Sequence, residues 1–256
     1  MRNAIEIRGL RIVYPSKAGA VHALENIGLE AKDGEFVSVL GPSGCGKSTL
    51  LKAVAGLLPP RRGSIRVYDE PVHGPTPNVG IVFQNPVLMG WRSVLKNIML
   101  QVEVRGLDHG TYRQRALELI KLVGIEGFEN HYPFQLSGGM QQRASICRAL
   151  IHDPPLLLMD EPFGALDALT RESMNVELQR IWLERRKTIL FITHSIPEAV
   201  FLADRVVVLS ERPGRVRTVM PVTLSRPRDL STMEDPDFVR MVGQLRREMQ
   251  STGKLD

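Results

Sequence analysis

The hydrophobic pattern changes character several times along the chain. Residues 36–40, 156–159 and 189–192 are almost continuously apolar, which is typical of parallel strands buried on both faces. Residues 5–14 alternate between apolar and polar side chains, which favours strands in an outer sheet. A crossover helix is predicted between the last two buried strands, with its apolar stripe at Met174, Leu178, Ile181 and Trp182. The pattern as a whole predicts an α/β fold.

Two further helical regions complete this picture. The segment from residue 84 to about residue 135 changes to helical spacing, with apolar positions at Tyr112, Ala116, Leu119, Ile120 and Val123. A last helix begins at 235–236 and has its apolar face at Phe238, Met241, Val242, Leu245 and Met249. We therefore expect one domain over residues 1–225, a helical subdomain inserted at about 85–155, and a short helical tail over 226–256.

Composition narrows the class of protein. The 256 residues are 43% hydrophobic, enough for a sizeable core, and no apolar run reaches the eighteen or so residues that a membrane-spanning helix needs. If the protein works at a membrane, another subunit must supply the span. The net charge of +5 is spread along the chain and only 5% of residues are aromatic, which argues against nucleic acid as a partner. The two cysteines indicate a reducing compartment rather than a disulfide framework.

One stretch matches the pattern G-x-x-x-x-G-K-[ST] of a phosphate-binding loop. It lies between the buried strand at 36–40 and a helical apolar pattern that begins at Leu50, which is the order such a loop requires. Lys47 can place its ammonium on the β- and γ-phosphates, and Ser48 can offer its hydroxyl to Mg²⁺. The predicted phosphate-binding residues of this loop are Gly41, Pro42, Ser43, Gly44, Cys45, Gly46, Lys47, Ser48 and Thr49.

A second stretch, residues 136–143, places Ser137, Gly138 and Gly139 before a predicted helix. A serine hydroxyl and a helix N-terminus both favour a bound phosphate. Alone, this arrangement is most often a simple helix cap. Its neighbours make it informative, because a buried strand ending in Asp160 and Glu161 follows shortly afterwards.

In these stretches the chain resembles the ATP-binding cassette (ABC) family, whose signature motif reads LSGGQ or a close variant and precedes a strand that ends in acidic residues. The resemblance extends over roughly residues 4–220. It implies a P-loop NTPase cassette with a RecA-like mixed-sheet core, an N-terminal antiparallel β subdomain and a helical subdomain. It also implies an ATP hydrolase that uses ATP and Mg²⁺, with Asp160 as a metal ligand and Glu161 as the residue that orients or deprotonates the attacking water.

Other positions match the family's motifs in order. Gln84 matches the glutamine that senses Mg²⁺ and the γ-phosphate, which adds it to Ser48 and Asp160 as a metal-site residue. His194 matches the switch histidine, and so counts with Glu161 and Lys47 as catalytic. Tyr14 matches the aromatic residue that stacks on adenine, although a tyrosine at the end of an edge strand can also be purely structural.

The resemblance further implies that two copies of the chain close head to tail on two ATP molecules. The residues expected to reach the partner chain's ATP are Ser137, Gly138, Gly139, Gln142 and Asp167, the last in the motif Ala165-Leu166-Asp167. An exposed Trp91 and Met89 would suit a membrane partner, but burial in the helical subdomain remains an equal alternative.

Within the family, residues 162–171, 198–206 and 213–215 are similar to the ATPase subunits of bacterial nitrate, sulfonate and taurine importers. Ser195 and Gly90 depart from that group, which commonly has aspartate and proline at these positions. The resemblance implies uptake of a small solute through a separate integral membrane permease, with a periplasmic or lipid-anchored solute-binding protein. Such a subunit lies peripherally on the cytoplasmic face of the membrane. The alternative is a soluble cassette ATPase without a transporter, such as a cluster-assembly ATPase.

Overall fold

A computed structural model describes residues 2–15, 19–164 and 166–250. Its central feature is a six-stranded sheet in the order β10-β9-β3-β8-β7-β6. Only β10 runs antiparallel to its neighbour, so the sheet is mixed, as expected. The strands are β3 (Phe36–Leu40), β6 (Val79–Val82), β7 (Leu156–Asp160), β8 (Thr188–Ile192), β9 (Arg205–Leu209) and β10 (Val216–Pro221).

A second sheet of four strands, in the order β2-β1-β4-β5, forms the predicted antiparallel subdomain. The sequence pattern suggests two strands within residues 5–14, but the structure has a single strand there, with register shifts that accommodate irregular residues. One side of this sheet packs on β3, α1 and their neighbours in a common hydrophobic cluster. Its strands are β1 (Asn3–Tyr14), β2 (Val21–Lys32), β4 (Arg62–Val67) and β5 (Glu70–Pro71).

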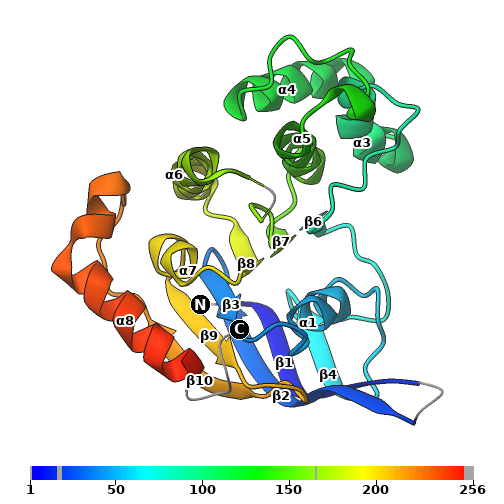
Figure 1. Cartoon of the computed structure of the whole chain (residues 1–256). Coiled ribbons are helices and arrows are strands. Elements are labelled where there is room, and N and C mark those ends of the chain that lie inside the picture. Colours follow the sequence, from blue (N-terminus) through cyan, green and yellow to red (C-terminus); the bar gives the residue numbers. More distant parts are fainter. Residues whose placement is uncertain (1, 16–18, 165, 251–256) are drawn as a thin grey trace.

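The helical subdomain has a hydrophobic core of its own, which includes Ile98, Ile120 and Cys147. Figure 1 shows its helices gathered at one end of the molecule, beyond β6 and β7. Its elements are α2 (Val94–Ile98), α3 (Leu100–Arg105), α4 (His109–Leu122), the 3-10 turn η1 (Pro133–Gln135) and α5 (Gly138–Leu150). A separate core allows the subdomain to move as a unit relative to the sheet.

The remaining helices cover the mixed sheet: α1 (Lys47–Val54), α6 (Ala168–Arg185), α7 (Ile196–Leu202) and α8 (Pro236–Gln250), with the 3-10 turn η2 (Leu230–Glu234) before α8. Helix α8 lies along the outer side of α7 (Figure 1). Its buried face joins the same core as Phe191 and Trp182, and is formed by Phe238, Met241, Leu245 and Met249. The helix of the expected C-terminal tail therefore packs against the core of the main domain. None of the helices in the described ranges is both long and apolar enough to cross a membrane.

Candidate functional site

The phosphate loop connects the end of β3 to the start of α1, as predicted. Gly46 precedes the helix with φ of 107°, and a Cβ there would lie 2.7 Å from Leu24 Cδ2 and 2.9 Å from Ala23 O. Only glycine combines this backbone conformation with such close packing. The N–H groups at the start of α1 therefore open toward the cavity, where an anion can bind them.

Lys47 and Ser48 are the first residues of α1. Lys47 is 7% exposed, and its Nζ donates to Gly41 O at 2.8 Å and to Pro42 O at 2.9 Å. Both acceptors are carbonyls of the loop itself. A bound phosphate can replace them as the partner of the Lys47 ammonium, because a hydrogen bond between two charged groups is stronger than one to a neutral carbonyl. Ser48 Oγ donates to Asp160 Oδ1 at 3.0 Å.

Asp160 stands at the end of β7 and is 5% exposed. Burial raises the pKa of Asp160, the Ser48 hydroxyl opposes the rise, and the neighbouring Glu161 adds to it. A divalent cation would offset the cost of the buried carboxylate. The hydroxyl of Ser48 and the carboxylate of Asp160 are hard oxygen ligands, and Mg²⁺ typically takes one or two such protein ligands and completes its shell with phosphate and water. The residues present fit Mg²⁺.

Glu161 faces the same cavity and contacts two other predicted site residues, Gln84 and His194. Its Oε2 accepts from Gln84 Nε2 at 3.2 Å and lies 3.1 Å from His194 Nδ1. The φ of Glu161 is 46°, a left-handed conformation that costs about 1–2 kcal/mol for a residue other than glycine. A bond from its backbone N to Ile192 O, at 2.9 Å, fixes this turn.

Sequence positions far apart thus meet around one cavity of about 410 Å³. Of the predicted residues, those that line it are Ser43, Gly44, Gly46, Lys47, Ser48, Thr49, Gln84, Glu161 and His194. Cys45 is buried instead, and burial raises the pKa of its thiol, which makes it a poor nucleophile. Tyr14 is beside the cavity rather than in its lining, with its hydroxyl 3.2 Å from Thr49 Oγ1.

The predicted signature residues do not join this cavity. Ser137 is the N-cap of α5, where its Oγ accepts from Met140 N at 3.3 Å, and both Ser137 and Gly138 are exposed. Asp167 caps α6 in the same way, accepting from Thr170 N at 3.0 Å, and is exposed as well. Its hydrogen bond to Thr170 lowers the pKa of Asp167. Ala165 of the same motif lies outside the described residues.

Gln142 differs from expectation. We expected its side chain to reach a second chain, but it is 1% exposed and donates to Phe83 O at 3.0 Å. Phe83 immediately precedes Gln84, so Gln142 connects the signature helix α5 to the strand end that carries Gln84. The physical reason is helical spacing, because Gln142 lies four residues before the buried Ile146 and shares its face.

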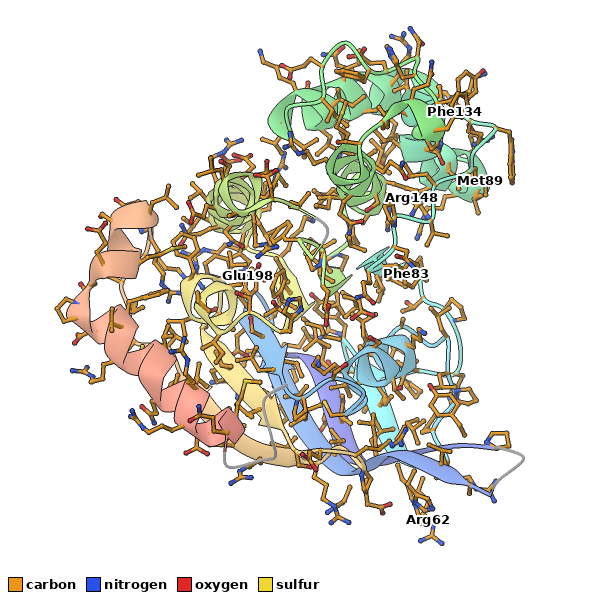
Figure 2. All side chains as sticks on the ribbon, in the orientation of Figure 1. Arg62, Phe83, Met89, Phe134, Arg148 and Glu198 are labelled. Atoms are coloured by element: carbon orange, nitrogen blue, oxygen red, sulfur yellow. The ribbon has the colours of Figure 1, made fainter. Side chains whose placement is uncertain are left out.

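Two further charged residues, which sequence reasoning missed, hold the site in place. Glu198 is 6% exposed, accepts from Thr193 Oγ1 at 2.5 Å and so fixes the residue before His194. Arg148 on α5 donates to Val87 O at 2.7 Å and Pro86 O at 2.8 Å, which holds the segment after Gln84. Figure 2 shows Glu198 beside the sheet and Arg148 at the border of the helical subdomain, near Phe83. A single charged residue at a helix position carries no signal for either role.

The fold and the site together define a phosphate-loop nucleoside triphosphatase with an inserted helical subdomain. The family model "ABC transporter" matches residues 24–164. The chain is 47% identical, over 94% of its length and 91% of the relative, to an uncharacterized ABC transporter ATP-binding protein of Methanocaldococcus jannaschii. It is 45% identical to the taurine import ATP-binding protein TauB of Escherichia coli (strain K12), over 87% of the chain and 89% of TauB.

Solved structures agree with these relatives. The dimeric structure of an ATP-binding cassette in a post-hydrolysis state, bound to ADP and Pi, superposes with a TM-score of 0.78 at 32% identity, covering 86% of this chain and all of that one. A bacterial ABC transporter cassette, also dimeric, gives a TM-score of 0.79 at 33% identity over the same shares. The chain belongs to the ABC transporter family, and it is an ATP-binding, ATP-hydrolysing cassette with the predicted fold.

Proposed function

We propose that the protein is the ATPase subunit of a bacterial importer and that it works as a head-to-tail dimer. The observation that carries the proposal is the position of the signature loop. Ser137 and Gly138 are exposed at the start of α5, and the ATP cavity is lined by other residues. A second copy can bring this loop to the cavity of the first, and each copy would then complete the other's site.

In this proposal the phosphate loop binds the phosphates of ATP, with Lys47 on the β- and γ-phosphates. Ser48, Asp160 and Gln84 would hold Mg²⁺, which supplies charge neutralisation on the β- and γ-oxygens. Tyr14 stands at the edge from which it can stack on adenine, since it contacts the last residue of the loop.

Glu161 is the proposed base. Its Oε2 takes a proton from the water that attacks the γ-phosphorus, while the bond to the bridging oxygen breaks and ADP leaves with the electron pair. Gln84 and His194 hold Glu161 from two sides at 3.2 and 3.1 Å. When Gln84 and His194 turn to the nucleotide, the same carboxylate is released for the water. The proposed contacts from the partner are Ser137, Gly138 and Gly139, with Asp167 close to the junction.

The link to import rests on the relatives named for taurine import and on one surface of this chain. Trp91 is 77% exposed and Val87 is 63% exposed, both in the segment after Gln84, while Met89 is half-buried. Of the two alternatives for Trp91, the structure has the exposed one. A permease that contacts this segment would act directly on Gln84. We therefore place the protein on the cytoplasmic face of the membrane, with a permease and a solute-binding protein for a small solute such as nitrate, a sulfonate or taurine.

Co-purification tests this proposal. The tagged chain, expressed in its native background and extracted with mild detergent, should retain a polytopic membrane protein. Reconstitution of that pair in vesicles, with a solute-binding protein and a panel of nitrate, alkanesulfonates and taurine, should give solute-stimulated ATP hydrolysis. The variant Trp91→Ala removes the exposed side chain of the proposed contact surface and should weaken retention. Recovery of a purely soluble complex, such as a cluster-assembly machine, would contradict the proposal.

A further inference from the structure

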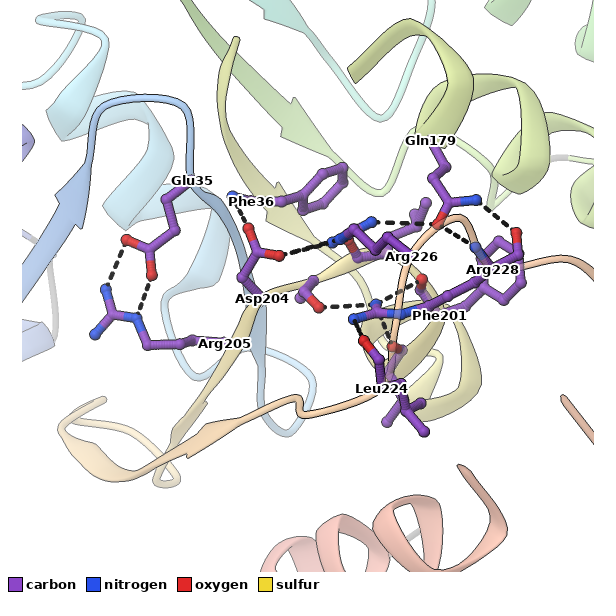
Figure 3. A network of polar contacts seen from close by, with 12 residues as sticks. Glu35, Phe36, Gln179, Phe201, Asp204, Arg205, Leu224, Arg226 and Arg228 are labelled. Carbon is purple, nitrogen blue, oxygen red and sulfur yellow. Dashed lines mark hydrogen bonds and ion pairs between the residues drawn. The ribbon is translucent and has the colours of Figure 1, made fainter. Parts of the chain in front are cut away.

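The C-terminal end of α7 is capped by two arginines from the segment that follows β10 (Figure 3). The last carbonyls of a helix lack partners within the helix. Arg228 Nη1 donates to the carbonyls of Val200, Phe201 and Ala203 at 3.0, 2.9 and 2.9 Å. Arg226 Nη2 donates to the carbonyl between them, that of Leu202. Two side chains thus bind the last carbonyls of a short buried helix.

Arg228 is unusual because it is a buried charge that, among the described residues, has no carboxylate as a hydrogen-bond partner; Asp204, which pairs with Arg226, acts on it only from a distance. Its side chain is among the largest fully buried ones, at 2% exposed. Its acceptors are the carbonyls at the end of α7 and Leu224 O at 3.0 Å. Burial, reinforced by the neighbouring Arg226, lowers the pKa of Arg228 to about 10, so the group stays protonated at neutral pH. The negative end of the helix dipole compensates the buried cation, which ties its position to that of α7.

The two arginines are themselves fixed to the core. Gln179 on α6 donates to Arg228 O at 2.5 Å and accepts from Arg228 N at 3.0 Å. The guanidinium of Arg226 lies 4.2 Å from the ring centre of Trp182 and donates to Asp204 Oδ1 at 3.0 Å. The other carboxylate oxygen of Asp204 accepts from the backbone N of Phe36, at the start of the strand that leads to the phosphate loop. Arg226 and Arg228 therefore connect α7 to α6 and β3.

The N-terminal end of α7 lies two residues after His194. Ser195 caps the helix, and its backbone N donates to Thr193 Oγ1 at 2.9 Å. A helix of this length is a rod of only about 10 Å. A shift at its C-terminal end is therefore transmitted to its N-terminal end. His194 is exposed and depends on this end of the rod for its position 3.1 Å from Glu161 Oε2.

We infer that Arg228 is a positioning residue for ATP hydrolysis: it holds α7 by its terminal carbonyls and thereby sets the reach of His194 toward the γ-phosphate side of the site. The inference rests on the proposed role of His194. Arg228 lies at the end of α7 that is far from the nucleotide cavity, and it would still affect catalysis. From the sequence, its segment was expected only to begin the C-terminal tail.

A double-mutant cycle on the full chain tests the inference. Arg228→Met keeps most of the buried volume and removes the donors, and we expect kcat for ATP to fall about tenfold with KM changed less than about twofold. In the His194→Ala background the same substitution should lower kcat less than about twofold further, because its effect passes through the missing side chain. Arg228→Lys, which keeps a cation, should recover kcat to within about threefold of wild type.

Arg240→Met is the matched control, since Arg240 pairs with Asp237 on the exposed side of α8 and should leave kcat unchanged. An equal loss from Arg228→Met in both backgrounds, or no loss in either, would overturn the inference. If the methionine variant does not fold, the cycle is run with Arg228→Lys, whose loss must likewise disappear in the His194→Ala background. Wild-type turnover of His194→Ala alone would refute the proposed role of His194. This result is distinct from a failure of the inference about Arg228, which the double-mutant comparison measures.

Discussion

Two helix N-termini with glycine at or next to their first residue can bind a phosphate, those of α1 and α5. The first is enclosed on one side by its own chain, because Asp160 at the end of β7, Glu161 just after β7 and His194 after β8 stand opposite the phosphate loop. The second is open. Ser137 caps α5, and within the described ranges its hydroxyl proton has no acceptor. The helix end at α1 thus faces polar residues of its own chain, whereas the helix end at α5 is exposed.

This difference indicates how the protein can couple nucleotide binding to movement. A site enclosed within one chain would bind ATP with no consequence for the arrangement of chains. An exposed helix end on a subdomain with its own core can instead be attracted to a phosphate held by another chain. ATP then stabilises the closed arrangement only through contacts that the open one lacks.

Substitution of the proposed base tests the enclosed site, and we expect the largest effect there. Glu161→Gln keeps the size and the hydrogen-bonding reach of the side chain but removes its basicity. Steady-state kcat should fall about 1,000-fold while the Kd for ATP changes little. Because hydrolysis is blocked, ATP should shift the protein to a dimer in size-exclusion chromatography. Glu184→Gln, on the exposed side of α6, is the control, and turnover near wild type for Glu161→Gln would remove Glu161 from its role.

Substitution of the open helix end should have a smaller effect. Ser137→Ala and Ser93→Ala each remove an N-cap, from α5 and α2 respectively. Both should cost about 1 kcal/mol of unfolding free energy, measured by urea titration. Only Ser137→Ala should also lower kcat, by about 10-fold to 100-fold, since a phosphate contact is lost with the cap. Equal turnover of the two variants would mean that Ser137 is no more than a cap.

Substitution of Asp153, at the other end of α5, should have the smallest effect. Asp153, just beyond that helix, lies 2.8 Å from both Arg115 on α4 and Lys187 before β8. Partial burial alone would raise the pKa of Asp153, but hydrogen bonds from Lys187 and Arg115 prevail and lower it to about 2. A carboxyl with a lowered pKa stabilises the fold above its unfolded pKa of about 4, and this contribution disappears as pH falls from 4 to 2.

Asp153→Asn should therefore lower the unfolding free energy by about 1 kcal/mol or less at pH 7, because the group is partly exposed. The variant should also lose less stability than wild type between pH 4 and 2. Asp237→Asn, in an exposed pair on α8, is the matched control. Parallel acid titrations of wild type and Asp153→Asn would show that the bridge between the subdomain and the sheet contributes nothing.

Local signals were sufficient for much of the site. The apolar run before Asp160 indicates a buried strand, and the glycines around Lys47 indicate a tight loop before a helix. Sequence reasoning therefore predicted the strands, the loop and the helix in order. Gln142 was assigned by its place in a motif, although its spacing to Ile146 already indicated the buried face. Arg228 carried no local signal, because its acceptors at the end of α7 are 25 to 28 residues away and become visible only when the chain is folded.

Subunit complementation tests most directly whether the phosphate loop and the signature loop of different chains form one site. Lys47→Ala disables the first loop, and Ser137→Glu disables the second by placing a carboxylate where a phosphate must bind. Each variant alone should be inactive. An equimolar mixture should regain about a quarter of wild-type ATP hydrolysis, since half of randomly formed dimers are mixed and each has one intact composite site. If the mixture stays as inactive as its components, the two loops do not share a site between chains.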